Sequence, residues 1–164
     1  MARLCFGGLR AFCPPPKQGK PPNDLYPGTA KYVQGEDRLV NVPLSAQPEE
    51  KEYLQKFDDQ VIPAVERFLE DHKGLIIISC GFDACVGDSP AHKGGFLHLT
   101  SATFGEITKR ISKLSADHCE GRLVSLLEGG YIGKMEDGSD GPLVQSFRAH
   151  IMQLIAAAKQ QAAA

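Results

Sequence analysis

Residues 75–88 read LIIISCGFDACVGD, and this stretch decides the fold class of the chain. The apolar run from Leu75 to Ile78 is too short for a typical helix and mostly β-branched, so it predicts a strand buried on both faces. A glycine follows and brings Asp83 into a turn. In open parallel sheets, functional groups lie just beyond the carboxyl ends of such strands. Asp83 is therefore either a functional carboxylate or the cap of a helical turn.

The composition is that of one globular domain. The chain has 164 residues, of which 42% are hydrophobic, and this length allows a proper core. Its formal charge of -2 argues against direct binding of nucleic acid, and no apolar run approaches the ~20 residues that span a membrane. The five cysteines show no paired close spacings, so neither a disulfide framework nor a zinc finger is indicated. We expect a reducing compartment, the nucleus or the cytoplasm.

The two ends of the chain differ from its middle. Residues 1–24 hold five prolines and no acid before Asp24, which predicts an extended, proline-rich tail that does not pack. A transit peptide is a less favoured alternative, because serine is absent there and no amphipathic helix is evident. We expect the folded part to span residues 25–158, and residues 159–164 of the alanine-rich end to fray.

Strand and helix patterns alternate along the folded part. Short strands are predicted at residues 38–44, 75–78 and 123–127. Helices are predicted at residues 49–72, from Thr100 or Ser101 to the glycine at 121, and along the stripe Val144, Phe147, Ile151 and Leu154. Pro63 is expected to kink or break the first of these helices. This alternation predicts an α/β fold with a parallel sheet, and three strands are few enough to suggest a partial domain or an oligomer.

Two polar side chains follow the ends of predicted strands. Asp83 comes after the strand at 75–78, and Tyr131 comes after the strand at 123–127. If both strands are parallel, both side chains emerge at the same edge of the sheet. Glycines precede each of them, which suits a tight turn or the close approach of backbone to a ligand. The alternative is structural, with Asp83 capping a turn and Tyr131 filling a gap.

The motifs of the chain resemble those of a known family. GFDACVGD at 81–88, GGFLHLT at 94–100 and LEGGY at 127–131 occur in the order found in the second half of the zinc-dependent histone deacetylases, a family that includes the acetylpolyamine amidohydrolases. YPGT at 26–29 and NVPL at 41–44 resemble earlier landmarks of the same domain. The resemblance covers roughly residues 25–155.

The resemblance implies a three-layer α/β domain of the arginase and deacetylase type, present here in part. It also implies a zinc ion at the base of a narrow channel that admits acetylated lysine or an acetylpolyamine. Asp83 matches one of the zinc-binding aspartates, and Tyr131 matches the tyrosine that donates a hydrogen bond to the substrate carbonyl. Gly129 and Gly130 match channel-lining glycines, and Tyr26 matches an aromatic residue of the channel wall.

Other parts of the family's site have no counterpart. A catalytic zinc takes three protein ligands, and the family supplies the other two, and a tandem histidine base, upstream of the YPGT motif. No histidine precedes His72 in this chain. The residues of ligand type near Asp83 lack a recognised spacing for replacing those ligands. They are His92, His98, Cys80, Cys85 and Asp88.

Two functions are therefore expected from the sequence. The first is that of a deacetylase-like zinc amide hydrolase acting on lysine or polyamine nitrogen, here as a truncated chain that is inactive alone. The second is a non-catalytic interaction module that binds a partner protein or forms a homo-oligomer through surfaces left open by the missing half.

Overall fold

The computed structural model describes residues 2–6, 42, 49–70, 74–88 and 99–163. Three strands and four α-helices, with a π-helical turn between the first two helices, make up this part of the chain. In order these elements are β1 (Ala2–Phe6), α1 (Glu50–Lys56), the π-helical turn η3 (Phe57–Val61), α2 (Ile62–Glu70), β2 (Ile76–Cys80), α3 (Ser101–Cys119), β3 (Leu123–Leu127) and α4 (Pro142–Ala162).

The three strands form one parallel sheet in the order β1-β2-β3. The register places Ile76 opposite Leu123 and Cys80 opposite Leu127, so β2 and β3 end at the same level. The predicted strands at 75–78 and 123–127 are therefore confirmed, as is their parallel pairing. Because parallel strands end at a common edge, the turns after β2 and β3 begin side by side.

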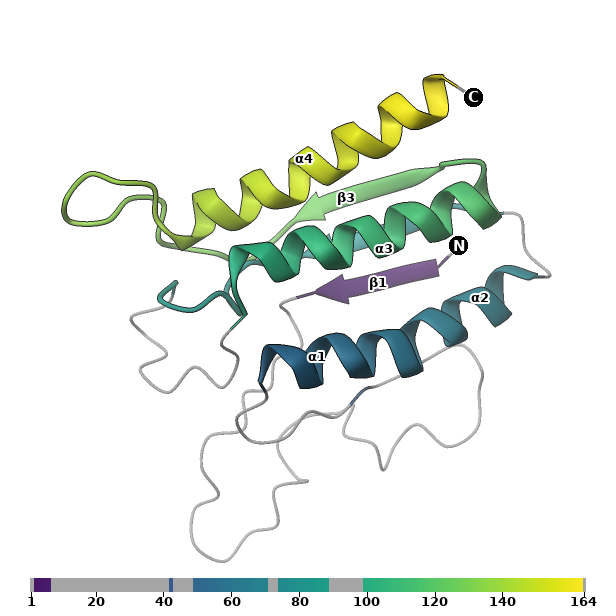
Figure 1. The fold of residues 1–164 in the computed structure, drawn as a ribbon, viewed down its shortest axis with the longest axis horizontal. Coiled ribbons are helices and arrows are strands. Elements are labelled where there is room, and N and C mark those ends of the chain that lie inside the picture. The colour runs from purple at the N-terminus through teal and green to yellow at the C-terminus, as the bar shows by residue number, and fades with distance from the viewer. Residues whose placement is uncertain (1, 7–41, 43–48, 71–73, 89–98, 164) are drawn as a thin grey trace, which may run out of the picture.

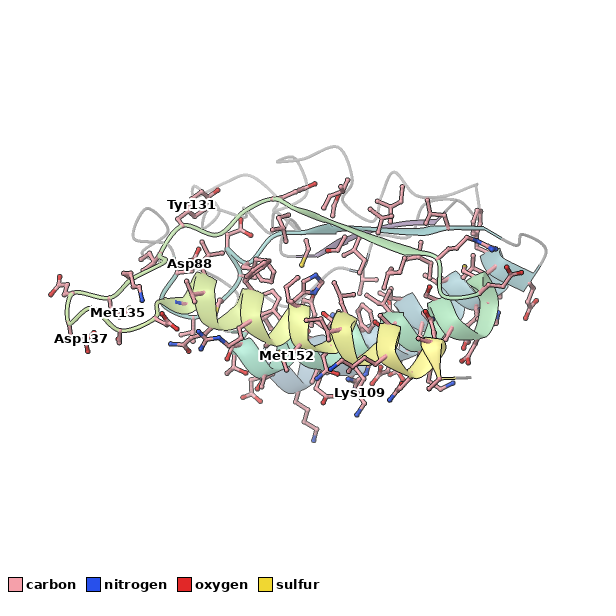
Figure 2. All side chains as sticks on the ribbon, turned by 90° about the horizontal axis from the view of Figure 1, so that it is seen from above. Asp88, Lys109, Tyr131, Met135, Asp137 and Met152 are labelled. Carbon is pink, nitrogen blue, oxygen red and sulfur yellow. The ribbon has the colours of Figure 1, made fainter. Side chains whose placement is uncertain are left out.

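All described helices cover one face of the sheet (Figures 1 and 2). Ile76 and Ile78 of β2 are fully buried and belong to one core with Phe104 and Ile111 of α3. The parallel sheet confirms the predicted fold class. Of the three layers expected, the described residues form two, the sheet and one helical layer.

One prediction about the N-terminal region is wrong. Ala2–Phe6 is not part of an unpacked tail but forms β1, which pairs along its whole length with β2. As an extended strand beside β2, this segment gives hydrogen-bond partners to the backbone groups of the central strand. The prolines lie further along the chain, so they do not interrupt this pairing. The predicted strand at 38–44 lies outside the described residues except for Val42, which is buried.

The predicted kink near Pro63 takes the form of a π-helical turn. Residues 57–61 form η3 directly before Pro63, and the backbone N–H of Ile62 donates to the carbonyl of Phe57 five residues earlier. Proline lacks a backbone N–H and its ring clashes with the preceding turn, so a wider turn relieves both problems without ending the helix.

The ends of α3 and α4 follow the sequence less closely. Thr100 is the N-cap of α3, as expected, but its hydroxyl donates to Glu50 of α1 at 2.6 Å instead of capping its own helix. Helix α4 continues to Ala162, beyond the position where fraying was expected. None of the described helices is both long and apolar enough to cross a membrane.

Candidate functional site

The candidate site lies where β2 and β3 end. Backbone pairing continues beyond both strands, because the N–H of Glu128 donates to the carbonyl of Cys80 at 2.9 Å and the N–H of Phe82 donates to the carbonyl of Gly129 at 2.7 Å. The turn that carries Asp83 is thus joined directly to the turn that carries Tyr131. The expected meeting of these two turns at one edge of the sheet is what the structure shows.

Asp83 lies against the backbone of the opposite turn. A Cβ atom built on Gly129 would stand 2.9 Å from Cγ of Asp83 and 3.0 Å from its Oδ1, so only glycine leaves room for the carboxyl group in this position. The Oδ1 atom is buried and accepts no hydrogen bond, although Asp83 as a residue makes other interactions. Asp83 lies in a turn that no helix follows directly, so it does not cap a helix of the described chain.

Gly130 meets a second steric requirement. Its φ is +126°, a conformation that side chains disfavour, and a Cβ there would stand 2.6 Å from Cδ1 of Leu143. The two glycines therefore let the chain after β3 pass closely between the β2 turn and the start of α4. Whether they also line a substrate channel, as the resemblance implies, stays a prediction.

Tyr131 is exposed at the end of this turn. Its side chain is 66% exposed, so it does not fill a gap in the core. Figure 2 shows it on the side of the β3 exit that faces away from the helices. The structural alternative for Tyr131 is wrong, and its phenol is accessible to a ligand at the sheet edge.

Asp88 holds the backbone at Tyr131, a role that sequence reasoning missed. This carboxylate is fully buried and accepts the N–H of Tyr131 at 3.0 Å and the N–H of Ile132 at 2.9 Å. From the sequence alone, Asp88 stands only as a possible replacement zinc ligand. Its contacts were not visible in the sequence because they join residues more than forty positions apart.

The β2 turn is anchored in the core on its other side. Phe82 is 1% exposed, and its ring centre lies 5.2 Å from that of Phe104 and 6.2 Å from that of Phe147. The turn also pairs with Leu99, whose carbonyl accepts the N–H of Val86 at 2.9 Å. The turn that carries Asp83 is thus anchored on one side of this residue by the buried ring of Phe82 and on the other by the backbone bridge between Val86 and Leu99.

A buried histidine connects the helical layer to β3 beneath the site. His150 is 1% exposed, and its Nδ1 lies 2.7 Å from the Thr108 hydroxyl while its Nε2 lies 2.9 Å from the Ser125 hydroxyl. Thr108 donates its proton to the carbonyl of Phe104, so Nδ1 carries the hydrogen and Nε2 accepts from Ser125. Burial lowers the pKa of His150, which favours this neutral form.

The cysteines near Asp83 are poor metal ligands. Burial and, after it, the nearby charge of Glu128 raise the pKa of the Cys80 thiol to about 12. Burial also raises the pKa of Cys85, and the charge of Asp88 adds to this. Because a metal binds the thiolate, both shifts oppose coordination.

Zinc fits these residues at one ligand position only. A carboxylate oxygen is an accepted zinc ligand, and Gly129 leaves the Asp83 carboxyl the space it needs. Across the described ranges, however, no group of three histidine, cysteine or acidic residues could hold a metal ion. Asp88 is occupied by backbone N–H groups, and His92, His98 and Tyr26 lie outside the described residues. Among the described residues at this edge, Asp83 therefore stays a predicted zinc ligand.

Comparison with known proteins identifies the family. The sequence model described as the Histone deacetylase domain matches residues 19–138. "Histone deacetylase 14, chloroplastic" of Arabidopsis thaliana is 35% identical over 129 residues, which are 76% of this chain and 28% of that protein. A "Probable deacetylase" of Archaeoglobus fulgidus is 34% identical over 65% of this chain and 29% of its own length.

Solved structures agree with the sequence relatives. The HD domain of HDA15 superposes with a TM-score of 0.54 at 29% identity, covering 81% of this chain and 33% of that one. Histone deacetylase Clr3 superposes with a TM-score of 0.55 at 29% identity, covering 73% of this chain and 17% of that one. The chain spans about a third or less of each of these relatives. With the parallel sheet and the paired turns at its edge, these matches show that the chain belongs to the histone deacetylase family.

Proposed function

We propose that this chain forms part of a deacetylase site that hydrolyses the acetyl amide of a lysine or polyamine nitrogen. The observation that carries the proposal is the direct pairing of the Asp83 turn with the Tyr131 turn, through the Phe82 N–H and the Gly129 carbonyl. It joins an acid of the ligand type to an exposed phenol at one edge of the sheet. The histone deacetylase family is generally zinc-dependent, which favours zinc as the metal.

Each residue has a proposed task. Bound zinc polarises an amide carbonyl and lowers the pKa of a coordinated water from 15.7 towards about 7. Asp83 is proposed as one of the protein ligands of that ion. The Tyr131 phenol is proposed to donate a hydrogen bond to the oxygen that becomes negative as the carbonyl is attacked. Gly129 and Gly130 are proposed to let the acetyl-bearing chain approach the backbone closely.

The described residues are not sufficient for this reaction. A catalytic zinc takes three protein ligands, and Asp83 is the one that the described part of the chain offers. Neither described histidine is available as the base, because His150 is enclosed by Thr108 and Ser125, and His118 lies in the last turn of α3, near the start of β3 and away from its exit. We therefore propose that the 164-residue chain does not turn over substrate without the remaining groups of a deacetylase domain.

A graft tests this proposal. Residues 74–163 would replace the matching segment of the HDA15 HD domain, and hydrolysis of an acetyl-lysine peptide and of N-acetylputrescine would be measured with zinc. We expect the graft to be active and Asp83→Ala to abolish its activity. Asp137→Ala is the matched control, because Asp137 is exposed and its carboxylate accepts the N–H of Ser139 away from the site.

The outcomes separate the parts of the proposal. A folded graft in which Asp83→Ala retains the full rate would refute the role of Asp83. The unmodified chain, assayed alone with zinc, is expected to show no activity that depends on Asp83. Turnover that disappears on Asp83→Ala would show that the chain completes its own site, and would contradict the proposed inactivity but not the reaction class.

A second candidate function rests on the surface of β3. In the sheet of the described strands β3 lies at one edge, and it exposes Val124, Leu126 and Leu127 by 42%, 51% and 56%. Val124 and Leu126 alternate with Ser125 and so share one face of the strand, and exposed apolar residues at a sheet edge favour self-association or binding of a partner protein. Light scattering of the full chain tests this, with Leu126→Lys as the variant. A stable monomer that the variant leaves unchanged would remove this candidate.

Substrate and compartment stay predictions at this level. Several relatives are named as histone deacetylases, which favours protein lysine as the substrate, and an acetylpolyamine stays a candidate from the motif resemblance. Two relatives are named as chloroplastic. A plastid therefore joins the nucleus and the cytoplasm as a compartment to be tested by fluorescent tagging of the full-length protein.

A further inference from the structure

We infer that Asp88 is a positioning residue for Tyr131: its buried carboxylate grips the backbone after β3 and fixes the direction in which the tyrosine side chain leaves the sheet. This inference deepens the proposed function and rests on it for the task of Tyr131. The grip itself is a property of the described structure and can be tested without any catalysis.

The contacts of Asp88 converge on two adjacent peptide groups. Both carboxylate oxygens lie 3.0 Å from the backbone nitrogen of Tyr131, and Oδ1 also lies 2.9 Å from that of Ile132. Asp88 is fully buried, so water does not compete for its oxygens. A buried carboxylate needs partners, and hydrogen bonds to a charged acceptor are stronger than neutral ones. These bonds therefore restrain the Tyr131 backbone more firmly than an ordinary loop contact would.

The tyrosine side chain has no comparable restraint of its own. Its ring is exposed, and its hydroxyl makes no hydrogen bond with any described residue. The position of the phenol therefore depends on the backbone from which it projects. In Figure 2, Asp88 lies on the helix side of the β3 exit and Tyr131 on the opposite side. The carboxylate therefore binds the Tyr131 backbone on the face opposite to the one from which the side chain projects.

Asp88 is itself fixed relative to the rest of the candidate site. Its N–H donates to the carbonyl of Cys85 at 3.1 Å, and the N–H of Cys85 donates to the carbonyl of Phe82 at 3.0 Å. Gly87 supplies a positive φ of +81° between them. Asp83 lies in the first of these two turns, between Phe82 and Cys85. Asp88 thus ties Tyr131 to the segment that carries the proposed zinc ligand, and keeps the two functional groups in register.

Hydrogen exchange of the full chain tests the grip directly. In Asp88→Ala, the amides of Tyr131 and Ile132 should exchange at least about tenfold faster, because both lose a charged acceptor. Asp88→Asn keeps one acceptor oxygen but introduces an N–H₂ group, so it should give an intermediate rate and serves as the variant if alanine impairs folding. Asp137→Asn removes a carboxylate from the same loop without touching Tyr131 and should leave both amides unchanged.

A second readout separates positioning from general stabilisation. The HN–Hα coupling constant of Tyr131, which reports its backbone φ, should move towards an averaged value in Asp88→Ala, while the amide of buried Ile111 keeps its wild-type exchange rate. Unchanged exchange at Tyr131 and Ile132 would overturn the inference. Equal acceleration at Ile111 would also overturn it, since it would show that Asp88 stabilises the whole fold.

Activity of the graft then distinguishes this inference from the proposed function. If both hold, Asp88→Ala lowers kcat with little change in KM, as Tyr131→Phe does, and Asp88→Asn recovers part of the loss. If the amides respond as expected but neither Asp88→Ala nor Tyr131→Phe changes kcat, the grip is real and the proposed function of Tyr131 is wrong. A loss of kcat in Tyr131→Phe without any loss in Asp88→Ala overturns the positioning role alone.

Discussion

Gly129 and Asp83 are in such close contact that the chain after β3 has no room for a side chain beside the acid. A Cβ on Gly129 would lie 2.9 Å from Cγ of Asp83, closer than real Cβ atoms approach other atoms. Gly129 does not have a positive φ, so the requirement for glycine here comes from the contact and not from backbone strain.

Gly129→Ala should therefore displace the Asp83 carboxyl or the turn that carries it. We expect a loss of about 1–3 kcal/mol in the free energy of unfolding, measured by urea denaturation, as for other overpacked sites. Gly133→Ala is the matched control, because a Cβ there would meet only Cγ2 of Val144 at 4.0 Å. Equal stability of the two variants would contradict this prediction, because it would show that the Asp83 turn moves aside without a cost in free energy.

His150 should make the stability of the fold depend on pH. Burial lowers its pKa below the ordinary value of 6.5, so the unfolded chain binds a proton more readily than the folded chain. The stability contributed by neutral His150 is present above about pH 6.5 and is lost as the pH falls through the lowered pKa. Its neighbours Thr108 and Ser125 carry no charge that would offset this.

The variant His150→Gln tests this linkage. At about pH 7.5 it should be less stable by about 1–3 kcal/mol, because the hydroxyls of Thr108 and Ser125 lose a well-placed partner. Between about pH 7.5 and pH 5 it should lose less stability than the wild type. Met152→Gln, at an exposed residue of α4 that does not titrate, is the control and should keep the wild-type pH dependence. Parallel pH curves for His150→Gln and the wild type would contradict this assignment.

The thiols of Cys80 and Cys85 should be protected in the native chain. With the pKa of Cys80 raised to about 12, roughly one molecule in ten thousand carries the thiolate at about pH 8. Alkylation with iodoacetamide, mapped by mass spectrometry, should therefore be far slower at both residues in native buffer than in urea. Rapid labelling of Cys80 under native conditions would show that the end of β2 opens to solvent.

The sequence predicted the fold well where local pattern and burial agree. The β-branched run before Cys80 and the apolar residues 123–127 are strands, as predicted, because both runs are too short for a helix and too apolar for a loop. Ala2–Phe6 was missed because the prolines that follow it dominated the composition of the region, whereas its pairing depends on β2, seventy-four positions away at Ile76. Long-range pairing of this kind leaves no local signal.

The candidate site was predictable to a similar extent. Parallel strands and the positions of Asp83 and Tyr131 were enough to predict that their turns share one edge. The task of Asp88 was not predictable, because its partners are backbone N–H groups and every residue except proline has one. The hydrogen bonds of His150 to Thr108 and Ser125 were not predictable for a related reason, because no sequence spacing of these residue types indicates that they are in contact.

The rate of the Tyr131→Phe graft tests the central claim most directly, which is that the paired turns after β2 and β3 serve one deacetylation reaction. Removal of the phenol hydroxyl leaves the exposed ring in place and deletes only the proposed donor to the carbonyl oxygen. We predict that kcat for an acetyl-lysine peptide falls by about 100- to 1000-fold while KM changes little. An undiminished kcat in a correctly folded Tyr131→Phe graft would contradict the claim.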